Sequence, residues 1–82
     1  MDLTDVEMFL TIVNTKSISK TAETLFLSQP TISHRLKMLE KELDFALITR
    51  SKGFKQIELT PEGVEFIPIA ERMLSLWKET RL

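Results

Sequence analysis

The first stretch of the chain combines helix-capping polar residues with apolar residues at helical spacing. Thr4, with Glu7 three residues later, has the spacing of a capping box and predicts the start of a helix. Apolar residues then recur at the period of a helix, so one face of it is expected to pack into a core: Val6, Phe9, Leu10 and Val13.

A polar break over residues 14–17 separates this helix from a second, shorter one. Ser17 or Ser19 is expected to cap the second helix, which should end near Leu25. The small side chain of Ala22 would let another helix cross closely at this point, although helix propensity by itself also explains an alanine here.

The third predicted helix runs from Gln29 to about Leu43 and begins after the capping residue Ser28. Pro30 fits its first turn, where a backbone N–H has no partner within the helix. Apolar residues recur along it at spacings of four, three and four and should face the core: Ile32, Leu36, Leu39 and Leu43.

The face opposite this core stripe begins polar and then becomes basic. At about 100° per residue, this opposite face carries Pro30, His34, Lys37 and Lys41. Thr31 and Ser33 lie on its flanks. No acidic residue occurs in this helix before Glu40, whereas a solvent-facing helix surface usually mixes Glu with Lys. An ordinary solvent-facing surface is the alternative interpretation of these residues.

The second and third helices, with the tight turn between them, predict a helix-turn-helix over about residues 18–37. In this motif the N-terminal residues of the second helix contact base edges in the DNA major groove. Amide and hydroxyl side chains can pair with bases, and lysines further along, such as Lys37, reach phosphates. The first turn supplies groups that suit base contacts: Ser28, Gln29, Pro30, Thr31 and Ser33. The pattern therefore predicts a DNA-binding domain.

Two strand-like runs, Leu47–Arg50 and Gln56–Thr60, follow the third helix. Ile57 and Leu59 alternate with polar residues, as in a half-buried strand, and Gly53 suits the turn of a hairpin. Such a wing would carry three cations near its tip: Arg50, Lys52 and Lys55. Basic hairpins commonly touch an adjacent minor groove or phosphates, although three cations on an exposed loop are also common elsewhere.

Thr60 and Pro61 predict the start of a last helix, as an N-cap followed by proline at the first helical position. The residues after them are more apolar than one core-facing stripe requires, and Pro68 is expected to bend the helix. A 20-residue helix is about 30 Å long, so its far end should project from so small a domain. We expect residues 61–82 to pair with a second copy of the chain through six side chains: Val64, Ile67, Ala70, Met73, Leu74 and Trp77. The alternative is a terminal helix folded fully back on its own domain.

Composition limits the classes of function. A chain of 82 residues forms one small domain, and the absence of cysteine excludes disulfides, thiol chemistry and cysteine-bound zinc. The single histidine has no arrangement of Ser, Cys or carboxylate around it that would make a catalytic or metal site, so we expect no enzyme, no metal and no cofactor. The acidic N-terminus resembles neither a signal peptide nor a membrane span, and a reducing cytoplasm is the expected location.

The net charge of −1 is unusual for a nucleic-acid-binding domain, but the charges are unevenly distributed. Residues 1–15 carry three acids and no base, residues 16–55 carry eight bases and four acids, and residues 56–82 carry five acids and three bases. The middle of the chain is therefore basic, as expected for a surface that faces phosphates.

The sequence resembles the N-terminal DNA-binding domain of the LysR-type transcriptional regulators over nearly its whole length. Single matches are weak, but the ordered set at fixed spacing is highly specific: Phe9, Val13, Ser17, Ala22, Leu25, Ser28-Gln29-Pro30, Ser33, Leu36, Leu39-Glu40, Leu43, Leu47, Arg50, Leu59-Thr60 and Gly63. The chain also departs from the family pattern. Asp44 stands where a glycine usually ends the recognition helix, Ile48 where Phe is common, Thr21 where Ala is common, and His34 where Arg is frequent.

The resemblance implies a mainly α-helical fold. A winged helix-turn-helix of three helices and a two-stranded wing would occupy residues 1–60, and a long linker helix over residues 61–82 would pair with its counterpart. It also implies a bacterial transcription factor that binds an interrupted palindrome in double-stranded DNA as a homodimer. By position, Lys37 would lie at phosphate and Arg50 in the minor groove beside the wing, and five residues would lie at the bases: Gln29, Pro30, Thr31, Ser33 and His34.

Members of the family normally continue into a ligand-sensing domain, so a small-molecule effector is expected only if the chain continues past Leu82. A protein-interaction module is the competing function, because winged helices sometimes bind proteins and the last helix suits pairing. A steep loss of affinity for duplex DNA with added salt would favour the DNA-binding function.

Overall fold

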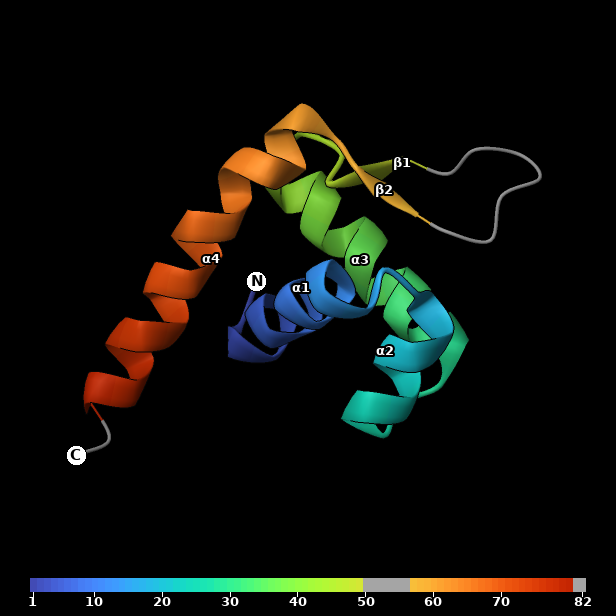
Figure 1. The fold of residues 1–82 in the computed structure, drawn as a ribbon, viewed down its shortest axis with the longest axis horizontal. Coiled ribbons are helices and arrows are strands. Elements are labelled where there is room, and N and C mark those ends of the chain that lie inside the picture. Colours follow the sequence, from blue (N-terminus) through green and yellow to red (C-terminus); the bar gives the residue numbers. More distant parts are fainter. Residues whose placement is uncertain (50–56, 81–82) are drawn as a thin grey trace.

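The computed structural model describes residues 1–49 and 57–80, which form four helices and a two-stranded sheet (Figure 1). In chain order these elements are α1 Leu3–Thr15, α2 Ile18–Leu25, α3 Gln29–Leu43, β1 Ile48–Thr49, β2 Glu58–Leu59 and α4 Pro61–Thr80. The strands run antiparallel, with Ile48 opposite Leu59 and Thr49 opposite Glu58. The predicted winged helix-turn-helix with a long last helix is confirmed.

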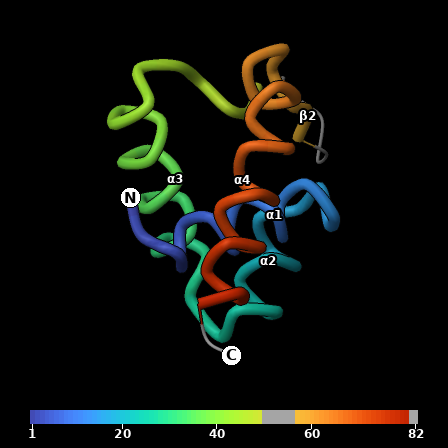
Figure 2. The backbone as a smooth tube through the Cα atoms, turned by 90° about the vertical axis from the view of Figure 1, so that its left-hand side faces the viewer, coloured from blue at the N-terminus to red at the C-terminus, as the bar shows by residue number. Residues whose placement is uncertain are grey.

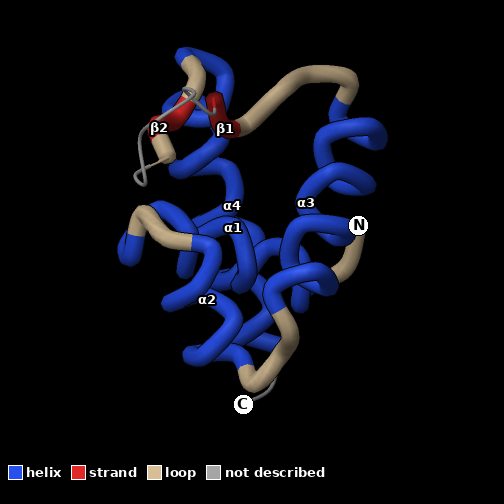
Figure 3. The backbone as a smooth tube through the Cα atoms, turned by 90° about the vertical axis from the view of Figure 1, so that its right-hand side faces the viewer, coloured by secondary structure: helices blue, strands red, loops and turns tan. Residues whose placement is uncertain are grey.

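Helix α1 lies at the centre of the fold and packs against the other three helices. Helix α4 runs along one side of it and α2 along the other (Figure 1), and the side view in Figure 2 shows α4 crossing in front of α1. Figure 3 shows the loop that leads from the C-terminal end of α3 to β1, which places the strands beside the start of α4. We call this pair of strands the wing.

The first helix begins earlier than the sequence suggested. Asp2, and not Thr4, is the N-cap: its carboxylate accepts the backbone N–H of Asp5 at 2.9 Å. The carboxylate of Asp5 in turn accepts the N–H of Asp2 at 3.1 Å. The prediction of a capping box at Thr4 and Glu7 is wrong, because Asp2 and Asp5 have the same three-residue spacing and satisfy the first N–H groups of the helix.

Because α1 is central, more than one stripe of it is buried. Val6 and Phe9 are buried as predicted, and Met8 and Ile12 are buried beside them. The two remaining members of the predicted stripe, Leu10 and Val13, are only partly buried and line a groove between α1 and α4. A helix that contacts three neighbours presents apolar residues in several directions, which a single-stripe interpretation does not capture.

The second and third helices have the predicted caps. The hydroxyl of Ser17 accepts the N–H of Lys20 at 3.1 Å, and the hydroxyl of Ser28 accepts the N–H of Thr31 at 3.2 Å. Helix α3 has the predicted bounds, and three of its four predicted core residues are at most 1% exposed: Ile32, Leu36 and Leu39. Leu43 is partly buried against the same core.

The first three helices end on residues in the left-handed conformation that are not glycine. The φ angles of Lys16, Phe26 and Asp44 are 53°, 56° and 63°. Asp44 therefore adopts the backbone conformation of the glycine that it replaces in the family pattern, and aspartate tolerates this conformation better than most residues. Its backbone N–H donates to the carbonyl of Glu40, so the end of α3 keeps its cap.

Thr21 is another departure from the family pattern that the fold accommodates. Its side chain is fully buried, and its Oγ1 lies 3.0 Å from Oγ1 of Thr15. A buried hydroxyl without a partner would destabilise the fold, whereas a paired one has little net cost. Ala22, the next residue, is 4% exposed and sits in the core, as its small size predicted.

Helix α4 is anchored to the core near its start. The ring centroid of Phe66 lies 5.2 Å from that of Phe9 and 6.3 Å from that of Phe45. The helix continues through Pro68, and its axis changes direction in its first half (Figure 1). None of the helices in residues 1–49 and 57–80 is long and apolar enough to cross a membrane.

Part of the apolar surface of α4 stays in contact with solvent. Four large apolar side chains along it are between 44% and 54% exposed: Val64, Ile69, Leu76 and Trp77. The alternative in which this helix folds fully back on its own domain is therefore wrong.

Candidate nucleic-acid interface

The first turns of α3 present an exposed polar surface. Ser33 is partly exposed, and the other side chains predicted to contact DNA from this helix and its cap are exposed: Ser28, Gln29, Pro30, Thr31, His34 and Lys37. Lys41 extends the same exposed face by one further turn. The side chains of Gln29, His34 and Lys37 make no hydrogen bond or ion pair with another described residue. Their donors and acceptors are therefore available to a ligand.

Two hydroxyls in the first turn hold each other in place. Oγ of Ser28 lies 2.8 Å from Oγ1 of Thr31, in addition to accepting the N–H of Thr31. A hydroxyl has one donor and two acceptor positions, so each of these side chains keeps capacity for at least one more hydrogen bond. Ser28 and Thr31 thus fix the start of the helix and remain able to contact a ligand.

Both acids of α3 are engaged away from the exposed face. The carboxylate of Glu42 hydrogen-bonds the N-terminal ammonium of Met1. The carboxylate of Glu40 accepts backbone N–H groups of Leu47 and Ile48 at the start of the wing. The positive charges of Lys37 and Lys41 are therefore not offset by the acids of their own helix.

Arg35 does not belong to the basic face, although its position in the basic middle of the sequence suggested phosphate contact. Its Nη2 lies 3.3 Å from Oδ2 of Asp2, and its Nε lies 3.2 Å from Oδ1 of Asp5. These ion pairs join the flank of α3 to the N-terminal turn of α1. Arg35 therefore orients α3 on the domain, while Lys37 and Lys41 point elsewhere.

The N-terminal segment shows the corresponding pKa shifts. The pKa of Asp2 is lowered from its ordinary value of 3.8, first by the N–H of Asp5 and also by the nearby charge of Arg35. The hydrogen bond to Glu42 raises the pKa of the Met1 ammonium above 8.0. Both shifts favour the charged forms, so the contacts between α1 and α3 are strongest at neutral pH.

The base of the wing is held from two sides. From α3, Oε2 of Glu40 accepts the N–H of Leu47 at 2.6 Å and that of Ile48 at 3.4 Å. From the start of α4, Thr60 donates its hydroxyl to the carbonyl of Ala46 at 2.6 Å and its N–H to the carbonyl of Leu47 at 3.0 Å. Residues 46–48 thus link the end of the predicted recognition helix to the start of the last helix.

Gly63 allows the start of α4 to approach the backbone of Leu47 closely. A Cβ atom at Gly63 would lie 2.2 Å from the carbonyl oxygen of Leu47, nearer than side-chain carbons approach such atoms. The N–H of Gly63 donates to Oγ1 of Thr60 at 2.8 Å, so Thr60 caps α4 as predicted. The roles of Glu40 and Gly63 in positioning the wing were not deduced from the sequence; the only signal was their place in the family pattern.

Part of the predicted site lies outside the described residues. This applies to the wing cations Arg50, Lys52 and Lys55 and to the turn residue Gly53. The described strands show that a hairpin starts and ends where predicted, since β1 and β2 fall within the two strand-like runs. The contacts predicted for its cations remain predictions.

The six residues expected at a dimer interface differ in accessibility. Val64 and Trp77 are 54% and 44% exposed, whereas Ile67, Met73 and Leu74 are partly buried against the domain. Ala70 has no exposed surface, because it faces the core of its own chain. Ala70 is therefore removed from the expected interface: periodicity placed it on the apolar side of α4 without telling which apolar residues the core already uses.

Comparison with known proteins gives a consistent assignment. Residues 3–64 match the family model described as "Bacterial regulatory helix-turn-helix protein, lysR family". The chain is 47% identical over 74 residues, 90% of its length, to the HTH-type transcriptional regulator CitR of Bacillus subtilis, and this region covers 25% of CitR. The chain thus spans about a quarter of the length of its curated relatives.

Solved structures agree with this assignment. The CbnR DNA-binding domain in a DNA complex superimposes with a TM-score of 0.90 and 30% identity, covering 98% of this chain and 90% of that one. The BenM DNA-binding domain in complex with catB site 1 DNA superimposes with a TM-score of 0.88 and 32% identity, covering 98% of this chain and 84% of that one. Both matches include the helix-turn-helix, the wing and the long last helix. The chain therefore belongs to the LysR family of bacterial regulatory helix-turn-helix proteins.

Proposed function

We propose that this domain binds specific double-stranded DNA sequences and thereby regulates bacterial transcription in the cytoplasm. The observation that carries the proposal is the first turn of α3: capped, exposed, uncharged and followed by Lys37 and Lys41, while both acids of the helix are engaged elsewhere. Such a helix suits the major groove, with amides and hydroxyls at base edges and lysines at phosphates. The domains of CbnR and BenM, which have this fold, were solved bound to DNA.

Individual roles follow from chemistry and position. Gln29 carries both a donor and an acceptor, which suits a bidentate contact to adenine. Thr31, Ser33 and His34 lie beside it and complete the base-reading surface, with Pro30 as an apolar contact. Lys37 would contact phosphate. Arg50 and Lys52 would extend the contact into the adjacent minor groove, where a narrow A·T-rich segment attracts arginine.

The test compares Gln29→Ala with Lys37→Ala on duplexes selected from random DNA by the wild-type protein. Gln29→Ala should weaken binding to the best site by about 1–3 kcal/mol and relax preference at one base pair. Lys37→Ala should weaken all sequences about equally and reduce the dependence of log K on log salt by about one. Arg72→Ala is the matched control, because Arg72 is an exposed cation on α4, away from this surface.

Two outcomes contradict the proposal. Equal losses on specific and random DNA for Gln29→Ala would remove its base-reading role. Binding to a protein partner that does not respond to salt, together with no measurable affinity for duplex DNA, would favour the protein-interaction module instead.

We further propose that the domain acts as a homodimer joined through α4. A small domain that leaves large apolar side chains exposed gains stability from association, and a twofold axis sets two copies of α3 on one face of DNA. Such an arrangement requires an interrupted palindrome. The proposed contacts use Val64, Ile67, Met73, Leu74 and Trp77.

Sedimentation equilibrium tests this assembly. The wild type should be dimeric at tens of micromolar, and Met73→Ala together with Trp77→Ala should produce folded monomers that lose most affinity for the full palindrome, because its half-sites no longer bind as one unit. A monomeric wild type, with unchanged DNA affinity in the double variant, would contradict the dimer.

A further inference from the structure

Phe26, in the turn between α2 and α3, is 94% exposed. The other large apolar side chains that are exposed in the described residues lie between 44% and 54%, so none of them is displayed as fully. The rings of Phe9, Phe45 and Phe66 contact one another in the core, whereas the ring of Phe26 contacts no other ring among the described residues. The ring of Phe26 therefore takes no part in the packing of the described fold.

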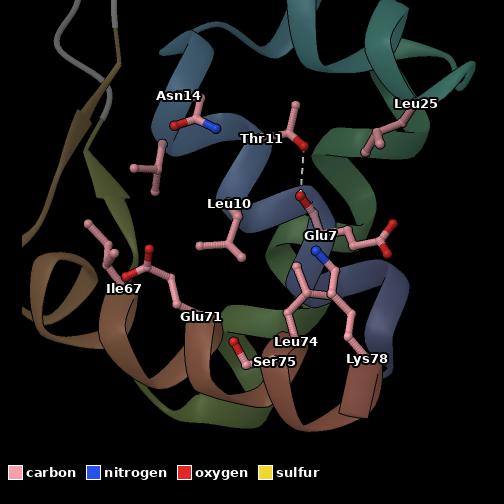
Figure 4. Close-up of a pocket in the computed structure, with 11 residues that line it drawn as sticks. Glu7, Leu10, Thr11, Asn14, Leu25, Ile67, Glu71, Leu74, Ser75 and Lys78 are labelled. Atoms are coloured by element: carbon pink, nitrogen blue, oxygen red, sulfur yellow. Dashed lines mark hydrogen bonds between the residues drawn. The ribbon is translucent and has the colours of Figure 1, made fainter. Parts of the chain in front are cut away.

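The turn holds this ring on the outside. The backbone N–H of Phe26 donates to the carbonyl of Glu23 at 3.3 Å, and that of Leu27 donates to the carbonyl of Ala22 at 2.9 Å. The side chains on either side of Phe26 face the domain: Leu25 lines the groove between α1 and α4 (Figure 4), and Leu27 packs against the core. The ring can therefore turn inward only if the hydrogen bonds of the turn break.

The backbone of Phe26 has a conformation that phenylalanine rarely adopts. Its φ angle is 56°, in the left-handed region, where glycine and asparagine are the usual residues and a bulky residue is an outlier. The turn of a helix-turn-helix often contains glycine. Phenylalanine at this position thus lowers the stability of the free domain, and no burial of its ring offsets the loss. A strained residue that the packing does not need indicates a function.

The position of Phe26 is next to the proposed base-reading turn. It lies two residues before Ser28, the N-cap of α3, so the Cα atoms of these residues are at most about 7 Å apart. The major groove, which the first turn of α3 is proposed to enter, is about 12 Å wide. A side chain attached so close to this turn reaches the wall of the groove when α3 is bound.

The chemistry of the ring selects its contact. The side chain of phenylalanine has no hydrogen-bonding group or charge, so it forms neither a hydrogen bond to a base edge nor an ion pair with a phosphate. The apolar group that DNA presents in the major groove is the C5-methyl of thymine, and phenylalanine is one of the side chains that contact it.

We propose that the ring of Phe26 packs against the C5-methyl of a thymine beside the bases that the first turn of α3 contacts. Phe26 would thereby add a preference for thymine at one position of each half-site. This inference rests on the proposed DNA binding and adds a specificity-determining residue to it.

The test combines Phe26→Asn with removal of single thymine methyls. In the duplex selected by the wild-type chain, each thymidine is replaced in turn by deoxyuridine, which lacks the methyl group. For the wild type, one such replacement in a half-site should weaken binding by about fourfold, the value of one buried methyl. For Phe26→Asn the same replacement should have no effect, and its affinity for the unmodified duplex should already be lower by at least about fourfold.

The stability of this variant excludes unfolding as the cause. Asparagine tolerates the left-handed conformation, so Phe26→Asn should raise Tm by about 5 °C. Lys16→Asn is the matched control, because Lys16 ends α1 with a φ angle of 53°. It should raise Tm similarly and leave the response to deoxyuridine as in the wild type.

Two further comparisons identify the type of contact. Phe26→Tyr keeps the aromatic ring and should keep the response to deoxyuridine. Phe26→Asn should leave the slope of log K against log salt unchanged, because the ring neutralises no phosphate, whereas Lys37→Ala reduces that slope.

Three outcomes would overturn this inference. If Phe26→Asn binds DNA as tightly as the wild type, the ring does not contact DNA and is left for a protein partner. If Phe26→Asn loses affinity but responds fully to deoxyuridine, the ring acts indirectly. A wild type that binds the duplex but ignores every thymine methyl contradicts this inference alone, whereas a wild type without affinity for duplex DNA contradicts the proposed function itself.

Discussion

Replacing Glu40 with alanine should destabilise the domain even though alanine is the better helix former. The carboxylate of Glu40 accepts the N–H of Leu47 at 2.6 Å and that of Ile48 at 3.4 Å, and Leu47 is fully buried. Helix propensity favours alanine over glutamate by only a few tenths of a kcal/mol. A buried N–H left without an acceptor costs about 1–3 kcal/mol. The lost acceptor therefore outweighs the gain in propensity.

The magnitude follows from the type of bond. A hydrogen bond to a charged acceptor contributes about 1.5–3 kcal/mol, and the contact at 3.4 Å adds less than the one at 2.6 Å. We expect Glu40→Ala to lower the free energy of unfolding by about 2–3 kcal/mol. For a domain of this size each kcal/mol changes Tm by about 4–8 °C, so Tm should fall by about 8–24 °C.

Thermal unfolding followed by far-ultraviolet circular dichroism measures this effect. Glu40→Gln keeps an oxygen acceptor and should lose less than half as much stability as Glu40→Ala. Glu42→Ala is the matched control, because Glu42 lies on the same helix and contacts only the exposed N-terminus among the described residues. A Tm for Glu40→Ala equal to that of Glu42→Ala would refute the reasoning, and so would a Gln variant as unstable as the Ala variant.

Three further changes test other parts of the fold. Gly63→Ala should lower the urea midpoint of unfolding, because the clash of its Cβ with the carbonyl of Leu47, about 1–3 kcal/mol, exceeds the roughly 1 kcal/mol that alanine gains in a helix. Ser28→Ala removes the cap of α3 and should cost about 1 kcal/mol in the same assay, with a larger loss of DNA affinity than of stability. Asp2→Ala should remove part of the acid sensitivity of the domain, because the pKa of Asp2 is lowered in the folded state. The contribution of this carboxylate to stability is therefore complete above pH 3.8 and is lost as the pH falls through the pKa of the folded state. Denaturation midpoints of wild type and variant should differ at neutral pH and converge in acid; a constant difference at all pH values would contradict the role of this carboxylate.

The start and length of α3 could be predicted from the sequence because local interactions determine them. Ser28 caps the N–H of Thr31, three residues away, and the apolar period from Ile32 to Leu43 identifies the buried side. The start of α4 at Thr60 is local in the same way. Once these two elements are placed, the exposed polar face of the recognition helix follows directly, so most of the candidate interface was readable before any tertiary contact was known.

Other features depend on contacts between residues far apart in the chain. Arg35 looked like one more cation of a basic patch, yet it forms ion pairs with Asp2 and Asp5 at the start of the chain. Ala70 shares the apolar period of α4 but belongs to the core.

The sequence by itself determined the helices, the N-caps of α2, α3 and α4 and the chemistry of the presented face, because hydrogen bonds and side-chain periodicity within one element involve residues at most four positions apart. The tertiary structure decided which charges are neutralised, which apolar residues remain for a partner, and how Glu40 holds the wing. Those outcomes depend on the distances between elements, which only the packing of α1 against α3 and α4 sets.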